Sequence, residues 1–170
     1  ESDNERPSAW TYRDAVIRAF NADLPFDTFI RHSIAGDVLK GDDPLAVALT
    51  GFITSGSTVT NVDGADREKA KYDKLDDIVS STGSAFLALT IGCARCHNHK
   101  YDPITQRDYY RLVGFFLPGS ARDRQIAIGR SGSKVKGLAW NGGNKKNNPL
   151  LERGDTEQKS GDVGLGVLAA

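Results

Sequence analysis

Hydrophobic side chains recur every three or four positions over the first third of the chain, a spacing that places them on one side of a helix. In the first such stretch, Tyr12, Val16 and Ala19 share one side and the charged residues lie elsewhere. Proline and turn-forming residues mark where the stretches begin and end. The predicted helices cover residues 9–20, residues 25–35 with a stop at Gly36-Asp37, and residues 45–53.

A charged run at residues 66–77 begins the longest predicted helix. Its inner positions, which step mostly by three or four, are Leu75, Ile78, Val79, Thr82, Phe86, Leu89 and Cys93. The pattern therefore predicts one buried rod that continues to Cys93. Gly83 is its weak point, since a helical glycine costs up to about 1 kcal/mol against alanine unless something packs close to its backbone. Asp76-Asp77 is interpreted as a solvated part of this helix.

A further helix is predicted after Asp102-Pro103, because the residues from Thr105 to Asp108 have the form of a capping box. Its apolar positions are Tyr109, Leu112, Val113 and Phe116. From residue 118 onward glycine, serine, asparagine and lysine dominate, and helical periodicity fades. We therefore predict an all-α fold, with a small helical domain over residues 1–117 and a loop-rich, extended tail over residues 118–170 that leans on a neighbouring protein.

The composition narrows the choice of partners. The 170 residues contain 22 Lys and Arg and 22 Asp and Glu, so the formal net charge is zero, and nothing in it indicates a nucleic-acid partner. No apolar run approaches the length of a transmembrane helix. A chain of this length can build one domain with its own core.

The sharpest chemical signal is the run Cys93-Ala94-Arg95-Cys96-His97, which holds the only two cysteines of the chain. Two thiols separated by two residues and followed at once by a histidine form the attachment pattern of c-type haem. One helical turn brings both sulfurs to the two vinyl groups of the porphyrin, and the adjacent imidazole faces the iron. The pattern predicts covalent haem c on Cys93 and Cys96, with His97 as the proximal ligand of the haem iron.

Other chemistries use the same atoms. A cysteine pair at this spacing can be a redox dithiol or a small disulfide, and Cys93, Cys96, His97 and His99 could together bind zinc. Zinc sites, however, usually space their second ligand pair away from the first, so four ligands within this short run fit a tetrahedron poorly. A zinc site and a structural or redox cysteine pair stay open beside the haem interpretation.

Methionine is absent from the chain, so the chain cannot supply the common sixth ligand of high-potential cytochromes c. His32 is a distal candidate, although its helical position points away from the apolar side and also suits a solvent-facing histidine. Tyr101, Lys100, water or a histidine of a partner are further candidates, as is an empty position. His99 is another metal-site candidate, or a loop histidine held by local hydrogen bonds. Arg95 and Lys100 are candidate partners of the haem propionates.

Several segments carry a family resemblance: residues 6–14, residues 16–21, Ile34-Ala35-Gly36-Asp37, residues 92–104 and residues 108–112. In this order they resemble the planctomycete-type cytochrome c-like domain, a family formerly catalogued as a domain of unknown function. The resemblance covers residues 5–117. It implies an exported protein, periplasmic or on the outer side of a bacterial envelope, often accompanied by another cytochrome-like domain. It implies no demonstrated reaction.

The same resemblance bears on the boundaries of the chain. Relatives carry helical sequence upstream of the position of Glu1, and residues 151–155 and 164–168 look like a junction to a companion domain. We therefore expect this chain to be part of a larger protein or complex.

Electron transfer by a single covalent haem is the function that these observations favour, with a redox protein or a neighbouring subunit as partner. An enzyme or sensor with an open iron site is one alternative, and a low-spin six-coordinate spectrum would count against it. A structural subunit cemented by haem or another metal is the other. No Ser-His-Asp arrangement, phosphate-binding glycine loop or paired-carboxylate signature stands out. Whether the chain is an enzyme stays open, with an electron-transfer protein favoured over a catalyst.

Overall fold

The computed structural model describes residues 6–57, 62–64, 66–128, 132–142 and 149–163. Residue contacts divide the chain into two compact units. The N-terminal unit combines Asp3–Ser55 with Gly119–Gly143, and the motif unit combines Gly56–Pro118 with Asn144–Ala170. The tail predicted as one stretch is therefore shared between the two units. Within the described residues, no helix combines the length and the apolar character that crossing a membrane requires.

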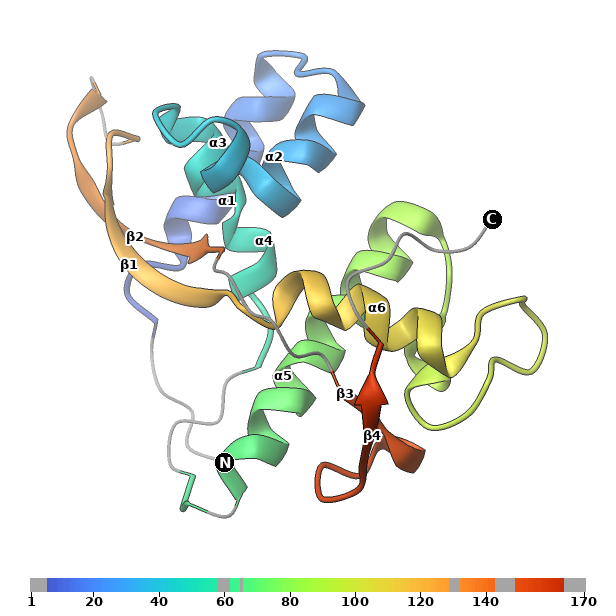
Figure 1. The fold of residues 1–170 in the computed structure, drawn as a ribbon. Coiled ribbons are helices and arrows are strands. Elements are labelled where there is room, and N and C mark those ends of the chain that lie inside the picture. The colour runs from blue at the N-terminus through green and yellow to red at the C-terminus, as the bar shows by residue number, and fades with distance from the viewer. Residues whose placement is uncertain (1–5, 58–61, 65, 129–131, 143–148, 164–170) are drawn as a thin grey trace. The chain divides into compact units, whose positions relative to one another are not determined.

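Figure 1 labels the helices and strands along the chain. The α-helices are α1 (Trp10–Asn21), α2 (Phe26–Leu39), α3 (Pro44–Leu49), α4 (Gly51–Thr54), α5 (Asp66–Thr82) and α6 (Gln106–Phe116). The strands are β1 (Ser120–Ile126), β2 (Val135–Asn141), β3 (Pro149–Leu151) and β4 (Lys159–Asp162). A π-helical turn covers Gly83–Leu87, and short 3₁₀ helices cover Ile91–Arg95 and Glu152–Gly154.

The all-α prediction is wrong, because the described part of the chain also contains antiparallel strands, so the fold is mixed α and β. β1 pairs with β2 from Ser120 opposite Asn141 to Ile126 opposite Val135, and β3 pairs with β4. The region expected to be a loop-rich tail thus forms two hairpins. Backbone hydrogen bonds between strands order these segments where their own side chains provide little apolar surface.

In the N-terminal unit, the β1–β2 hairpin packs against the helices that precede it (Figure 1). The core of this unit consists of Ala15, Ala19, Val47, Ala48, Leu49, Ile126, Ile128 and Ala139. Small residues on α1 let the apolar side of the hairpin come close, which buries Ala139 completely. The Trp140 backbone N–H donates to Oγ1 of Thr50, the residue between α3 and α4, at 2.9 Å, so the hairpin and this junction share a buried polar contact as well.

The first predicted helix is confirmed, but the second does not end at Gly36-Asp37. α2 continues to Leu39 and carries a kink at Ala35, whose φ and ψ are −140° and 26°. A Cβ at Gly36 would lie only 2.1 Å from the Ala46 carbonyl oxygen. The glycine therefore permits close contact between α2 and α3 rather than stopping the helix.

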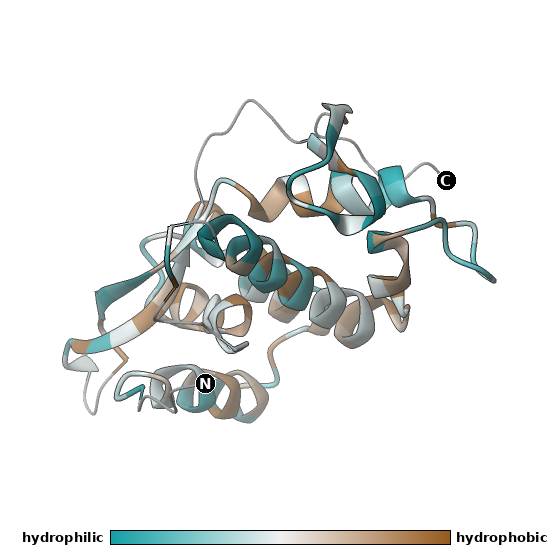
Figure 2. Cartoon of the chain, turned by 90° about the horizontal axis from the view of Figure 1, so that it is seen from below, coloured by the Kyte–Doolittle hydropathy of each residue, from teal (hydrophilic) through white to brown (hydrophobic). Residues whose placement is uncertain are grey.

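In the motif unit, α5 and α6 pack against each other, burying Leu75, Ile78, Val79, Tyr109, Tyr110 and Val113. The charged first turns of α5 are hydrophilic, and its later turns are paler in Figure 2. The predicted capping box is confirmed: Thr105 accepts a hydrogen bond from the Asp108 backbone, and the Asp108 carboxylate accepts one from the Thr105 backbone.

The long helix does not reach Cys93. α5 ends at Thr82, a π-helical turn follows, and Ala88 adopts a left-handed conformation with φ of 54°. A Cβ at Gly83 would lie 2.7 Å from Cδ1 of Ile91. The chain therefore folds back so that Ile91 packs on the glycine, and Cys93 lies in a separate 3₁₀ helix rather than on the rod.

Candidate functional site

The two cysteines share one side of a short turn. Cys93 lies within the 3₁₀ helix Ile91–Arg95, and Cys96 follows it directly. A 3₁₀ helix has three residues per turn, so positions i and i+3 lie on the same side. Cys93, Cys96 and His97 are exposed, whereas Ala94 between them is fully buried. Both cysteines are free thiols. The side chains of Cys93, Cys96 and His97 on this 93–97 loop therefore face outward, and the buried Ala94 packs the loop against the protein.

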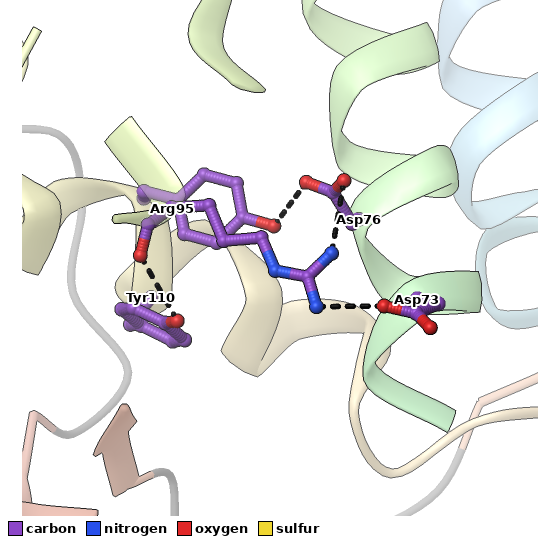
Figure 3. A network of polar contacts seen from close by, with 5 residues as sticks. Asp73, Asp76, Arg95 and Tyr110 are labelled. Atoms are coloured by element: carbon purple, nitrogen blue, oxygen red, sulfur yellow. Dashed lines mark hydrogen bonds and ion pairs between the residues drawn. The ribbon is translucent and has the colours of Figure 1, made fainter. Parts of the chain in front are cut away.

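Arg95 is the second inward-facing residue of the 93–97 loop (Figure 3). Its Nη2 lies 2.7 Å from Asp73 Oδ1, and its Nη1 lies 3.2 Å from Asp76 Oδ2. Burial by itself would lower the pKa of the guanidinium, but the hydrogen bond that it donates to Asp73 and the charge of Asp76 raise that pKa overall. The cation therefore stays charged, and it ties the loop to α5 through a pair of carboxylates.

Two tyrosines of α6 complete this network. The Tyr109 hydroxyl donates to Asp76 Oδ1 at 2.5 Å, and the Tyr110 hydroxyl donates to the Arg95 carbonyl oxygen at 3.1 Å. Their rings meet edge to face, with centroids 5.0 Å apart. Burial raises the pKa of both phenols, and the hydrogen bond to Asp76 raises that of Tyr109 further. Both hydroxyls therefore remain protonated donors at neutral pH.

Gln106, the first residue of α6, connects three segments. Its side-chain Nε2 donates to the Arg95 carbonyl at 2.9 Å and to the Leu151 carbonyl at 3.0 Å. Its backbone N–H donates to Asn98 Oδ1 at 2.9 Å. The N-terminus of α6 is thus tied both to the 93–97 loop and to strand β3.

His97 is exposed, and its Nδ1 lies 2.8 Å from the carbonyl oxygen of Asn98. A carbonyl oxygen can only accept, so we assign the proton of the neutral ring to Nδ1. The other nitrogen, Nε2, then carries the lone pair that can bind a metal. The backbone of the next residue thus sets the tautomer that a ligand through Nε2 requires.

His99 serves the turn that follows. Its side chain is 6 % exposed, and its backbone N–H donates to the Ile104 carbonyl at 2.8 Å. Nδ1 lies 2.9 Å from the Asp102 backbone nitrogen and 3.2 Å from the Asp102 carboxylate, contacts that require opposite roles of Nδ1 in a neutral ring. We assign the acceptor role, because the N–H contact is shorter and the carboxylate is 42 % exposed to water. Nε2 then carries the proton.

The remaining predicted site residues lie apart from this network. His32 lies on α2 in the N-terminal unit and is half-buried rather than solvent-facing, and its Nδ1 has no hydrogen-bond partner among the described residues. Lys100 is exposed, with its ammonium group 5.2 Å from the centre of the Tyr101 ring. Within the described ranges, no three His, Cys, Asp or Glu side chains converge into a site for a metal ion.

The sequence did not point to the residues that support the 93–97 loop, which are Asp73, Asp76, Gln106, Tyr109 and Tyr110. The interpretation of Asp76 as solvated is wrong, because its carboxylate accepts hydrogen bonds from both Arg95 and Tyr109. One available signal was the spacing of Asp73 and Asp76, three residues apart and therefore on one side of α5.

Comparison with known proteins adds one finding. A family model, PSCyt2, described as a protein of unknown function (DUF1549), matches residues 1–120. No curated protein and no solved structure matches the chain. The matched residues include the N-terminal helices, the 93–97 loop and the whole of α6. Because the match spans well over half of the 170 residues, this chain belongs to the PSCyt2 family.

Proposed function

We propose that this chain is a single-haem c-type cytochrome that transfers electrons, with haem c bound to Cys93 and Cys96. One observation carries the proposal: both free thiols and His97 face outward, while Ala94 and Arg95, the other two residues of the loop, face the protein. The spacing of the three residues is that of covalent haem attachment. The residues present therefore fit the group that their spacing predicts.

Each residue of the loop has a defined task in this proposal. The two thiols would each add S–H across one vinyl double bond, so that a C–S bond forms, the hydrogen goes to the other vinyl carbon, and nothing leaves. His97 would bind the iron through Nε2, the nitrogen that its contact with Asn98 leaves unprotonated. Once bound, haem supplies one-electron redox chemistry.

Arg95 has a different task from the one expected. Its guanidinium is engaged by Asp73 and Asp76, so we assign it to positioning the loop rather than to a propionate. Lys100 remains the proposed propionate partner, because it is exposed and close in sequence to His97. Held from inside by Ala94 and Arg95, the loop needs little rearrangement to keep both thiols on one side.

The sixth ligand of the iron would be one of the factors that set the reduction potential. The chain has no methionine, so we propose a potential below that of a His/Met cytochrome, with His32, a histidine of a partner or water as the sixth ligand. His99 is a poor choice, because its Nδ1 accepts a hydrogen bond and its Nε2 carries the proton. The family resemblance supports a location in a bacterial envelope and a redox protein or neighbouring subunit as partner.

Haem content tests the proposal directly. The chain is exported in a bacterial host that matures c-type cytochromes, and the purified protein is analysed by its pyridine haemochrome spectrum. We expect one haem per chain that survives acid-acetone extraction, and its loss in the Cys93→Ser/Cys96→Ser double variant. The reduced and oxidised spectra then distinguish a six-coordinate low-spin carrier from an open iron site.

Single variants provide the matched controls. Cys93→Ser and Cys96→Ser each keep one thiol, so we expect one link, with the spectral shift of a remaining vinyl group. Covalent haem in the double variant, or no haem in the wild-type chain in a host that loads another c-type cytochrome, would contradict the proposal.

A further inference from the structure

The C-terminal hairpin, formed by β3, Glu152–Gly154 and β4, packs against the 93–97 loop. A Cβ built at Gly154 would lie 3.0 Å from Cys96 Sγ, 3.4 Å from Arg95 Cγ and 3.5 Å from Arg95 Nε. The backbone of the hairpin is therefore in direct contact with the second cysteine. This segment lies beyond residues 1–120, the part of the chain that matches the family.

The turn of this hairpin is built for a close approach. Arg153 and Gly154 both adopt positive φ, of 53° and 77°. Such a conformation is strained for arginine, whereas glycine adopts it freely. At Gly154 the absence of a side chain is required twice, by the backbone conformation and by the space that Cys96 Sγ occupies. A residue with a side chain at position 154 would therefore be strained and would crowd the thiol of Cys96.

Three contacts hold the hairpin in this place. Leu151 is fully buried. Its carbonyl accepts from Gln106 Nε2 at 3.0 Å, and the same amide group donates to the carbonyl of Arg95. Farther along, Lys159 Nζ forms an ion pair with Glu68 Oε1 of α5 at 2.5 Å. Because Gln106 joins the hairpin and the loop through one amide, their relative position depends on that residue.

We infer that the C-terminal hairpin is a strap that shields one side of Cys96 and makes the two thiols unequal toward bulky reagents. Cys96 is still exposed, so small reagents reach it, but the backbone at Gly154 closes one direction of approach. A large planar molecule therefore reacts first at Cys93, and at Cys96 after it is oriented or after the strap moves. For haem, the first thioether then forms at Cys93, a consequence that rests on the proposed function.

Site-resolved alkylation of the haem-free, full-length chain tests the strap. The reduced protein is treated under native conditions with N-ethylmaleimide or with a maleimide that carries a polyethylene glycol chain. Trypsin cleaves after Arg95 and so separates the two cysteines for mass spectrometry. For each reagent, the alkylation rate at Cys93 is divided by the alkylation rate at Cys96, and this ratio is compared between the small and the bulky maleimide. Because both reagents attack the same two thiols, differences in intrinsic thiol reactivity cancel in the comparison. We expect this ratio to be several-fold larger for the bulky maleimide.

Two variants locate the effect in the hairpin. Leu151→Ala removes a buried anchor of the strap, so the ratio for the bulky reagent should fall toward that for the small one. Gly161→Ala is the matched control, because Gly161 lies in the same hairpin with φ of 41° and has nothing within 4 Å of a built Cβ. It strains the backbone without touching the anchor or Cys96, so the ratio should stay as in the wild-type chain.

The same ratio for both reagents in the wild-type chain would overturn the inference, as would an unchanged ratio in a folded Leu151→Ala variant. If Leu151→Ala unfolds, circular dichroism reveals it, and the wild-type comparison decides alone. Haem loading is measured separately from alkylation. If the chain binds no haem but its two cysteines alkylate unequally with the bulky maleimide, the proposed function is contradicted and the inference about the strap is supported. In loaded samples, Cys96→Ser should retain more singly linked haem than Cys93→Ser.

Discussion

Arg95 shows how one residue between two cysteines can serve the site without facing outward. From the sequence, Arg95 is a cation beside the predicted haem, and it is expected to pair with a haem propionate. In the structure its guanidinium lies 2.7 Å from Asp73 and 3.2 Å from Asp76, and its side chain is only 20 % exposed. Its charge is used inside the protein, where two carboxylates compensate the cost of its partial burial.

At this scale, the two neighbouring tyrosines allow a matched comparison. Tyr109→Phe removes a hydrogen bond to a carboxylate, and Tyr110→Phe removes one to a neutral carbonyl. Hydrogen bonds to charged groups contribute about 1.5–3 kcal/mol, against about 0.5–1.5 kcal/mol for neutral ones. We therefore expect Tyr109→Phe to lower the free energy of unfolding more than Tyr110→Phe does. Because the Asp76 side chain is 29 % exposed, water screens its charge, and the loss in Tyr109→Phe should lie near the lower end of the range for charged groups.

Urea unfolding followed by circular dichroism measures both tyrosine variants. An equal or larger loss in Tyr110→Phe would contradict the expectation that the hydrogen bond to the Asp76 carboxylate contributes more than the one to the Arg95 carbonyl. Tyr109→Phe/Asp76→Asn adds a further check, because the effects of the two changes should be less than additive when the groups form one interaction.

The break after α5 shows what apolar periodicity can and cannot predict. The stripe from Leu75 to Thr82 is real and buried, and it correctly indicated which side of α5 faces α6. The continuation through Phe86 and Leu89 also fitted helical spacing, yet both side chains are only half-buried. Gly83 was recognised as a weak point, but only the packing of Ile91 on it explains why the chain turns back there.

Gly83→Ala tests this explanation. Helical propensity alone would favour alanine by about 1 kcal/mol. The added Cβ, however, would lie 2.7 Å from Cδ1 and 2.8 Å from Cγ1 of Ile91, and overpacking of this kind costs about 1–3 kcal/mol. We therefore expect Gly83→Ala to reduce the free energy of unfolding, measured by urea denaturation.

The matched background for this element is Ile91→Ala, which removes both clashing carbons. There the added Cβ keeps only its 3.1 Å approach to the Leu89 carbonyl oxygen, so Gly83→Ala should cost clearly less than in the wild-type chain. If Gly83→Ala stabilises the wild-type chain, the contact with Ile91 does not determine where the helix ends.

Across the whole molecule, segments distant in sequence complete each unit. In the N-terminal unit, helices from the start of the chain share a core with β1 and β2. In the motif unit, β3 and β4 join α5 and α6. The predicted division at residue 117 followed a change in composition, whereas long-range contacts connect each half of the later sequence to a different earlier segment.

Thr50 offers a test of this interleaving. Its Oγ1 accepts from the Trp140 backbone N–H, 90 positions away, and donates to the Val47 carbonyl at 2.7 Å. Thr50→Val keeps the shape but leaves a buried N–H without its acceptor, which costs about 1–3 kcal/mol. Thr50→Ser keeps the hydroxyl and serves as the control. We expect thermal unfolding at a clearly lower temperature for valine than for serine, and equal losses would contradict the role of this contact.

The strands of residues 118–170 could not be predicted from local pattern. β1 has the sequence Ser-Ala-Arg-Asp-Arg-Gln-Ile, in which only Ile126 is a large apolar residue. Its stability comes from pairing with β2 and from the burial of Ile126 in the core of the N-terminal unit. Such contacts join residues that a short sequence window never contains together.

The sequence by itself determined the spacing of Cys93, Cys96 and His97, the first helix, the cap of α6 and the buried side of α5, because each depends on residues a few positions apart. Only the tertiary structure decided that Arg95 faces inward, that the helix ends at Thr82 and that the C-terminal hairpin touches Cys96. These features depend on carboxylates, an isoleucine and a glycine that reach the site from other elements. Their positions follow from how the whole chain packs, which no local pattern records.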